Sequence, residues 1–84
     1  MRFEATSEFV ERYRHLDQQT LECVDEALSR LLDEHGGAWA RQNRVVGAGG
    51  AAWLIALRCR DDDCGLYWRE GTADSIVLLL LIRR

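Results

Sequence analysis

The chain has 84 residues and a formal net charge of -3, enough for one small domain, residues 1–84, whose hydrophobic core is near the lower limit of what folds alone. It has no proline, no low-complexity run and no internal repeat, so we expect neither a linker nor a disordered tail. Because residues 1–4 do not form a secretory signal and the longest apolar run, 76–82, is far shorter than the roughly 20 residues of a membrane span, we expect a soluble cytoplasmic protein with no membrane partner.

The chain begins with a predicted strand and a short helix. Phe3 and Ala5 alternate with polar neighbours, which is the period of a half-buried strand. Thr6-Ser7 then offers an N-cap. An apolar stripe at helical spacing follows, formed by Phe9, Val10, Tyr13 and Leu16.

A second, longer helix is predicted between Asp17, its N-cap, and Gly36-Gly37, the usual place for a left-handed C-cap. Its apolar stripe comprises Leu21, Val24, Leu28, Leu31 and Leu32. Since only one or two residues separate the helices, we expect an antiparallel hairpin whose single apolar side lies on a sheet.

The rest of the chain predicts a largely antiparallel sheet. A short strand is expected around 44–46, followed by a glycine turn and by strands at 51–60, 64–70 and 75–84. Turns are expected at 61–63 and 71–74. In the last strand, strict alternation assigns Ile76, Leu78, Leu80 and Ile82 to one face and Val77, Leu79 and Leu81 to the other. The predicted fold class is therefore α+β, with both helices on one face of the sheet.

The predicted sheet is apolar on both faces, but two helices can cover only one of them. We expect another chain, or a second copy of this one, to pack on the open face. The predicted partner interface comprises Leu54, Ala56, Leu79 and Leu81.

Three cysteines are an odd number, which argues against a disulfide framework. Cys59 and Cys64 flank a turn and could bridge across a hairpin under oxidation, although small buried apolar roles are favoured. With only His15 and His35 as further ligands, the spacing matches no zinc motif, and we expect neither a metal nor a cofactor.

Several short motifs follow one another along nearly the whole chain. They are Phe9 and Tyr13, Leu16-Asp17, Ala27-Leu28, Leu31-Leu32, residues 44–47, 53–58, 66–68 and 76–78, and the final Arg83-Arg84. In their order and spacing they resemble the RelE/ParE superfamily of bacterial type II toxins. The resemblance implies a toxin neutralised by a cognate antitoxin; RelE-like members cleave mRNA on the ribosome, and ParE-like members act on DNA gyrase.

The chain departs from the cleaving members of this family. Leu54 and Ala56 stand where RelE-type enzymes place lysines, and Gly65 or Cys64 where the fourth strand begins with an arginine. The Tyr or His that these enzymes carry at or beyond the last strand has no counterpart before Arg84. Whether the chain is an enzyme is therefore left open.

The remaining cations define the candidate site. An atypical catalytic set would be Arg44, Arg58 and Arg83. The predicted nucleic-acid or target-binding residues are Arg44, Arg58, Arg60, Tyr67, Trp68 and Arg84. The alternative is structural: Arg58 and Arg60 would pair with the acids of the 61–63 turn, and one of Tyr67 and Trp68 would lie in the core.

We expect a toxin, or a degenerate relative, that binds a macromolecular target such as gyrase or the translation machinery. The alternatives are a ribosome-dependent mRNA endonuclease of RelE type and, from another class, a non-toxic dimerisation module. The expected partners are an antitoxin, the ribosome with mRNA or gyrase, and a second copy or other chain in a homo-oligomer or hetero-complex.

Overall fold

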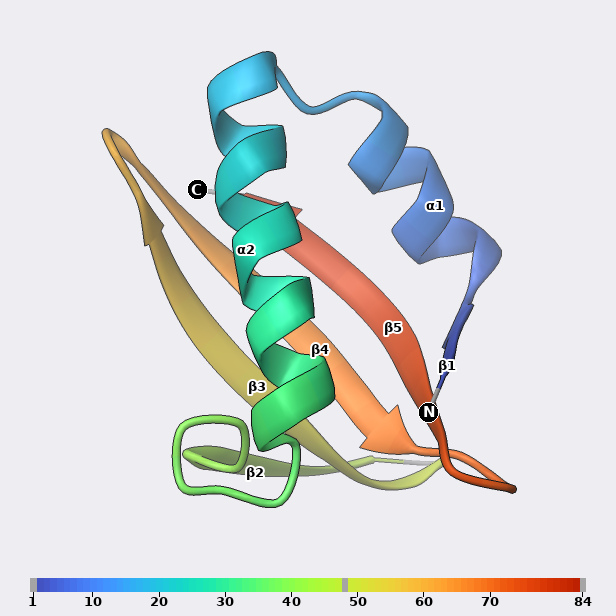
Figure 1. Ribbon diagram of the computed structural model, residues 1–84. Helices are drawn as coiled ribbons and strands as arrows, with labels where there is room; N and C mark the ends of the chain where they lie inside the picture. Colours follow the sequence, from blue (N-terminus) through green and yellow to red (C-terminus); the bar gives the residue numbers. More distant parts are fainter. Residues whose placement is uncertain (1, 48, 84) are drawn as a thin grey trace.

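The computed structural model describes residues 2–47 and 49–83 and has an α+β fold with two helices and one five-stranded sheet (Figure 1). In chain order the elements are β1 (Arg2–Ala5), α1 (Ser7–Arg14), α2 (Gln18–Glu34), β2 (Asn43–Gly47), β3 (Gly50–Cys59), β4 (Asp62–Glu70) and β5 (Ser75–Arg83). The predicted order of strand, helical hairpin and sheet is confirmed. Arg84, one of the predicted target-binding residues, lies outside the described residues.

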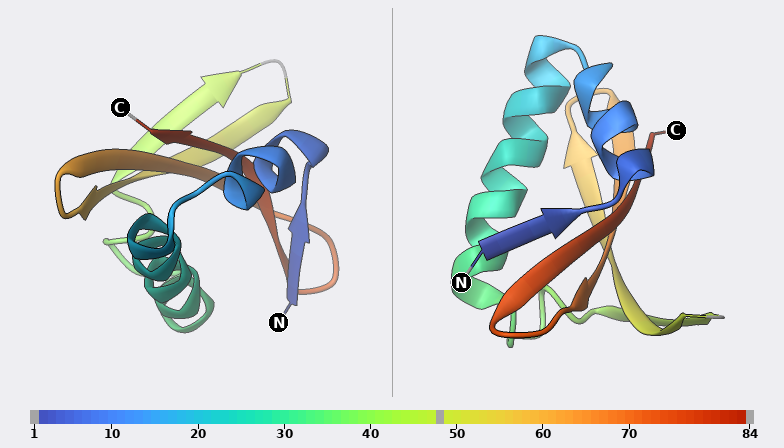
Figure 2. Two further views of the ribbon diagram at one scale, coloured as in Figure 1. Left: turned by 90° about the horizontal axis from the view of Figure 1, so that it is seen from above. Right: turned by 90° about the vertical axis from the view of Figure 1, so that its right-hand side faces the viewer.

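The sheet has the order β1-β5-β4-β3-β2. β1 runs parallel to β5, and the other three pairings are antiparallel. Both helices lie on the same face of the sheet (Figures 1 and 2). Thr6 fixes the junction between β1 and α1, because its backbone N–H donates to the carbonyl of Leu78 (3.0 Å) and its hydroxyl to that of Leu79 (2.6 Å).

The helix ends differ in how they are capped. The Thr6 hydroxyl accepts a hydrogen bond from the backbone N–H of Phe9 at 3.1 Å, as an N-cap does. The predicted left-handed C-cap of α2 is wrong: His35 has right-handed φ, and neither Gly36 nor Gly37 has positive φ. The N–H of Gly37 instead continues the helical turn by donating to Glu34 O at 2.9 Å.

The core lies between α2, α1 and the middle of the sheet. Its fully buried members include Val24, Leu31, Ile55, Leu66 and Trp68. Trp68 meets the hydrogen-bonding need of its buried indole by donating to Ala40 O at 2.9 Å. Two residues of the predicted apolar stripes, Val10 (42% exposed) and Leu32, are exposed instead of buried. A helix that packs on a sheet buries the side chains of one face only.

A β-bulge interrupts the pairing of β4 with β5. Tyr67 pairs with Leu80 and Trp68 with Leu78, which leaves Leu79 without a directly opposed residue. The inserted residue shifts the alternation of β5 by one position. The faces predicted for Leu80, Leu81 and Ile82 are therefore wrong: Leu81 is 1% exposed and belongs to the core.

The turn between β3 and β4 is tighter than the predicted 61–63. Cys59 pairs with Asp62, so that only Arg60 and Asp61 remain in the loop. Arg60 has a φ of 57°, as a two-residue hairpin requires of a loop residue. Asp62 and Asp63 belong to β4 and are therefore available to side chains on neighbouring strands.

A disulfide joins Cys23 of α2 to Cys59 of β3, with their Cα atoms 5.7 Å apart. The possible bridge between Cys59 and Cys64 is therefore not formed, and the favoured role of a small buried residue without a bond is wrong for Cys23 and Cys59 but confirmed for Cys64. Cys64 pairs with Leu57, not with Cys59, and its thiol is free and buried. Burial raises the pKa of the Cys64 thiol.

The disulfide encloses a segment with a sequence separation of 36, so its loss should lower the free energy of unfolding by up to about 4 kcal/mol. Urea unfolding with and without reductant measures this difference. A Cys23→Ala/Cys59→Ala chain should resemble the reduced protein and be insensitive to reductant. Equal stability of the oxidised and reduced chains would contradict the prediction.

The two helices are also linked by Tyr13, whose hydroxyl donates to Asp25 Oδ1 at 2.5 Å. This hydrogen bond, with help from burial, raises the pKa of Tyr13 from 10.0 to about 12. The folded state thus favours the protonated phenol, so the stabilisation is complete below pH 10 and is lost as the pH rises toward 12.

In a Tyr67→Phe chain, where Tyr13 is the remaining tyrosine, tyrosinate absorbance should report a pKa of about 12 while the protein stays folded. An added Asp25→Asn substitution should lower this pKa, because the amide carries no charge to oppose ionisation. Titration at the ordinary value in both chains would exclude the helix-to-helix hydrogen bond.

Candidate functional site

The face of the sheet turned away from the helices is the candidate functional site. Its members alternate along the strands with the core residues. We call this surface the open face; it comprises Val45, Ala52, Leu54, Ala56, Arg58, Asp63, Gly65, Tyr67, Arg69, Leu80 and Ile82, together with Leu79 at the bulge.

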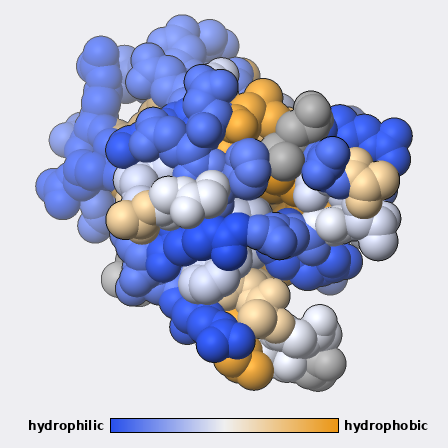
Figure 3. Space-filling model, turned by 60° about the horizontal axis from the view of Figure 1, so that its bottom comes forward, coloured by the Kyte–Doolittle hydropathy of each residue, from blue (hydrophilic) through white to orange (hydrophobic). Residues whose placement is uncertain are grey.

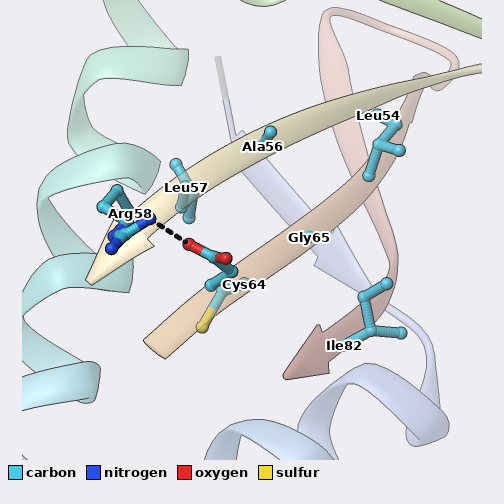
Figure 4. Close-up of a pocket in the computed structure, with 8 residues that line it drawn as sticks. Leu54, Ala56, Leu57, Arg58, Cys64, Gly65 and Ile82 are labelled. Atoms are coloured by element: carbon cyan, nitrogen blue, oxygen red, sulfur yellow. Dashed lines mark ion pairs between the residues drawn. The ribbon is translucent and has the colours of Figure 1, made fainter. Parts of the chain in front are cut away.

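One end of the open face is a hollow of about 430 Å³ (Figure 4). Gly65 lies in it between two apolar side chains: a Cβ at this position would be 2.8 Å from Ile82 Cγ1 and 3.1 Å from Leu54 Cδ1. Leu54 and Ile82 thus close over the bare backbone of β4. Arg58 lies at the margin, 3.4 Å from the Asp63 carboxylate (dashed in Figure 4), and both side chains are largely exposed.

The other end is a second hollow, also of about 430 Å³, between the β2–β3 turn and the beginning of α1. Its lining residues are mostly apolar or glycine, and include Val45, Ala52, Tyr67, Leu79 and Leu80. Leu54 of the first hollow is the register partner of Tyr67 of the second. The two hollows are therefore neighbours on the open face, and we call them together the open-face groove.

The predicted partner interface largely coincides with this groove. Leu54 and Ala56 line the first hollow, and Leu79 lines the second. Leu81 is the exception, because the bulge turns it into the core beneath the helices. The prediction of an apolar face without a helical cover is confirmed for the described residues.

The three arginines of the predicted catalytic set do not converge. Arg44 is opposite Trp53 and so points to the helix side of the sheet, whereas Arg58 belongs to the open face. Trp53 and Arg58 are five residues apart on β3, which is roughly 16 Å along a strand. This separation and the opposite faces prevent Arg44 and Arg58 from acting on one phosphate.

Arg83 is held in an ion-pair cluster at the end of β5. Its Nη2 lies 2.6 Å from Asp62 Oδ2, and its Nη1 lies 3.4 Å from Asp17 Oδ1, at the start of α2. The guanidinium thus connects β4, β5 and the helical layer. This arrangement gives Arg83 a structural role and leaves it on the helix side.

The aromatic pair divides as expected. Trp68 is 0% exposed, so it cannot stack on a base, and its place among the target-binding residues is wrong. Tyr67 lies in the open-face groove and is partly exposed. Arg60 is exposed in the β3–β4 turn, and it is Arg58 rather than Arg60 that pairs with an acid, Asp63 near the start of β4.

The open face offers apolar contact rather than acid–base chemistry. Arg58, Asp63, Tyr67 and Arg69 are its ionisable groups, and none is buried. Within residues 2–47 and 49–83, no group of three His, Cys, Asp or Glu side chains is arranged to hold a metal ion. An uncovered, concave, apolar strand surface of this kind is suited to binding the side chains of another polypeptide.

Sequence reasoning missed two features of this region. Gly65 is needed for the close approach of Leu54 and Ile82, and its position inside an apolar strand was the available signal. Arg41 anchors the segment after α2: it lies over Trp53 at 5.0 Å from the ring centre and pairs with Glu70. No local pattern distinguishes Arg41 from an ordinary surface arginine.

Comparison of the chain with models of known protein families, with curated proteins and with solved structures gives no match. Among the described residues, no helix is long and apolar enough to cross a membrane.

Gly65→Ala should lower the free energy of unfolding by about 1 kcal/mol, because the new methyl group collides with Ile82 and Leu54. In an Ile82→Ala chain the same substitution should cost less than half as much, since the closest neighbour has been removed. Urea unfolding of the four chains forms a double-mutant cycle. Equal costs in both backgrounds would show that Ile82 does not close over Gly65.

Proposed function

We propose that this chain is the toxin component of a bacterial type II toxin-antitoxin pair of the RelE/ParE type, or a degenerate relative of such a toxin. It acts by binding a macromolecular target, such as gyrase or the translation machinery, in the cytoplasm. The observation that carries the proposal is the open-face groove: an apolar surface on a chain this small is costly unless a partner covers it.

The order of elements supports the family proposal. A strand, a helical hairpin and a sheet that is antiparallel in three of its four pairings follow in the order that the sequence resemblance implies. The cognate antitoxin would bury its apolar side chains in the open-face groove, with Leu54, Tyr67 and Leu80 as the central contacts.

The dispersal of the arginines favours binding over cleavage. An endonuclease needs cations gathered around one phosphate and groups that move protons. Here Arg44, Arg58 and Arg83 lie apart, and Arg83 is occupied by Asp62 and Asp17. The endonuclease of RelE type is therefore the weaker alternative.

The disulfide bears on the proposed location. Thiols are kept reduced in most cytoplasms, so Cys23 and Cys59 would be thiols there, and the bond would form on oxidation. The open face does not depend on this bond, because its residues lie on the side of the sheet opposite to Cys59.

Expression of the chain alone in bacteria tests the proposal, with growth and mRNA ends as readouts. The expected result is growth arrest with unbroken mRNA. Leu54→Glu, which places a charge in the groove, should relieve the arrest, whereas Val10→Glu on the exposed side of α1 should not. The two substitutions are matched in the charge they introduce and differ in the surface they alter.

Two other outcomes would contradict the proposal. Cleavage of mRNA at codon boundaries would show that the chain is an endonuclease of RelE type. Normal growth at a verified level of folded protein would exclude both toxin functions. Normal growth would leave the open face as the surface of a non-toxic interaction module.

A further inference from the structure

The β2–β3 hairpin forms an arm that projects from the body of the protein (Figure 2, right). Every residue of β2 is exposed, and Val46 is 72% exposed. Figure 3 shows apolar side chains on the projecting arm, at the bottom of the view. A two-stranded hairpin that extends beyond the rest of its sheet is only marginally stable in water. The arm is therefore the part of the chain that a binding partner would stabilise most.

The two edges of the sheet differ in how they resist pairing with another strand. β1 carries Arg2 and Glu4, which is the usual charged protection of an edge. β2 has Arg44 as its single charge, and no charged residue occurs between Val45 and Leu57. Of the two edges, β2 is the one open to strand addition.

The register of the hairpin identifies the free hydrogen-bonding groups of β2. Gly47 pairs with Gly50 next to the two-residue loop, so the backbone N–H and C=O groups of these two residues point toward each other. By alternation the backbone groups of Val45 point toward those of Ala52. The N–H and C=O groups of Arg44 and Val46 point away from β3, toward the free edge of the sheet. Within residues 2–47 and 49–83, no hydrogen bond engages these outward groups.

We propose that β2 pairs antiparallel with β2 of a second copy, on a two-fold axis that passes through Val45. Arg44 of each copy then lies opposite Val46 of the other, and both residues exchange backbone hydrogen bonds with their counterparts. All the outward groups of the strand are satisfied, and the two sheets become one ten-stranded sheet, twice the five strands of each copy.

The charges of β2 select this register. A shift that centres the axis on Arg44 would oppose two guanidinium groups directly, which destabilises a strand pair. With the axis at Val45, each guanidinium instead has an uncharged valine opposite, whose methyl groups can pack on the arginine stem.

The pairing also extends the open-face groove. Val45 lines the second hollow, and in the dimer the two Val45 side chains meet on the open face at the axis. Each copy thus contributes a residue to the groove of the other. The proposal stands apart from the toxin function, since self-association is measured without reference to any target.

Sedimentation equilibrium of the full chain over a range of concentrations tests the register through charge. Val46→Lys should weaken the dimer at least about tenfold, because it places a lysine opposite Arg44 twice. Val46→Glu should be at least as tight as the unaltered chain at low salt, since glutamate opposes the same arginine. Arg44→Glu/Val46→Lys should restore the dimer by reversing both charges.

Val10→Lys is the matched control, because it alters another exposed valine that belongs to helix α1 and not to the paired strand, and it should leave the dimer unchanged. Circular dichroism verifies the fold of each chain. A chain that stays monomeric at about 1 mM would overturn the proposal. So would equal weakening by Val46→Lys and Val46→Glu, or the failure of the double substitution to restore the dimer.

Discussion

The structure depends on one imbalance: a sheet that is apolar on both faces and a helical layer that can cover only one. α1 and α2 supply the cover for Ile55, Leu66 and Trp68, and no further element exists within the described residues for the face that carries Leu54 and Tyr67. Apolar surface in contact with water is unfavourable roughly in proportion to its area. The uncovered face is therefore both the weakness of the isolated chain and the reason to regard it as a binding protein.

The same imbalance explains why the cations are dispersed. Residues on an apolar strand face serve contact, and the three arginines of the predicted catalytic set lie away from its centre: Arg58 at the end of β3, Arg44 on the edge strand and Arg83 at the end of β5. At the margins they pair with Asp63, Asp62 and Asp17 or remain in solvent. Recognition of another polypeptide needs such an apolar centre with a charged rim. Phosphoryl chemistry instead needs cations gathered at the centre of the site.

Much of the fold could be predicted from sequence because it follows from local periodicity. The Thr6 cap, the stripe through Val24 and Leu31, and the alternation along β3 are each properties of a few neighbouring residues. The uncovered face could also be inferred, since it requires only a comparison of apolar strand faces with the number of helices.

What could not be predicted depends on residues distant in the chain. The bulge at Leu79 arises from how β5 meets β4, and the run of leucines gives no sign of where the alternation shifts. The Cys23–Cys59 bond depends on where α2 crosses the end of β3, which no spacing rule specifies. The positions of Arg44 and Arg83 relative to each other likewise follow from strand order rather than from sequence pattern.

The parallel pairing of β1 with β5 has a consequence for how the chain folds as it is synthesised. Arg2 pairs with Ser75, so the first strand must wait for the last before it enters the sheet. Pairings this distant in sequence form late, because the intervening chain must first be closed into a loop. During that interval most of β3 belongs to the uncharged stretch between Val45 and Leu57, and β4 has no β5 to pair with. A partly folded chain whose sheet still lacks β5 is thus the form most exposed to aggregation, and a chaperone or an early binding partner would protect it most.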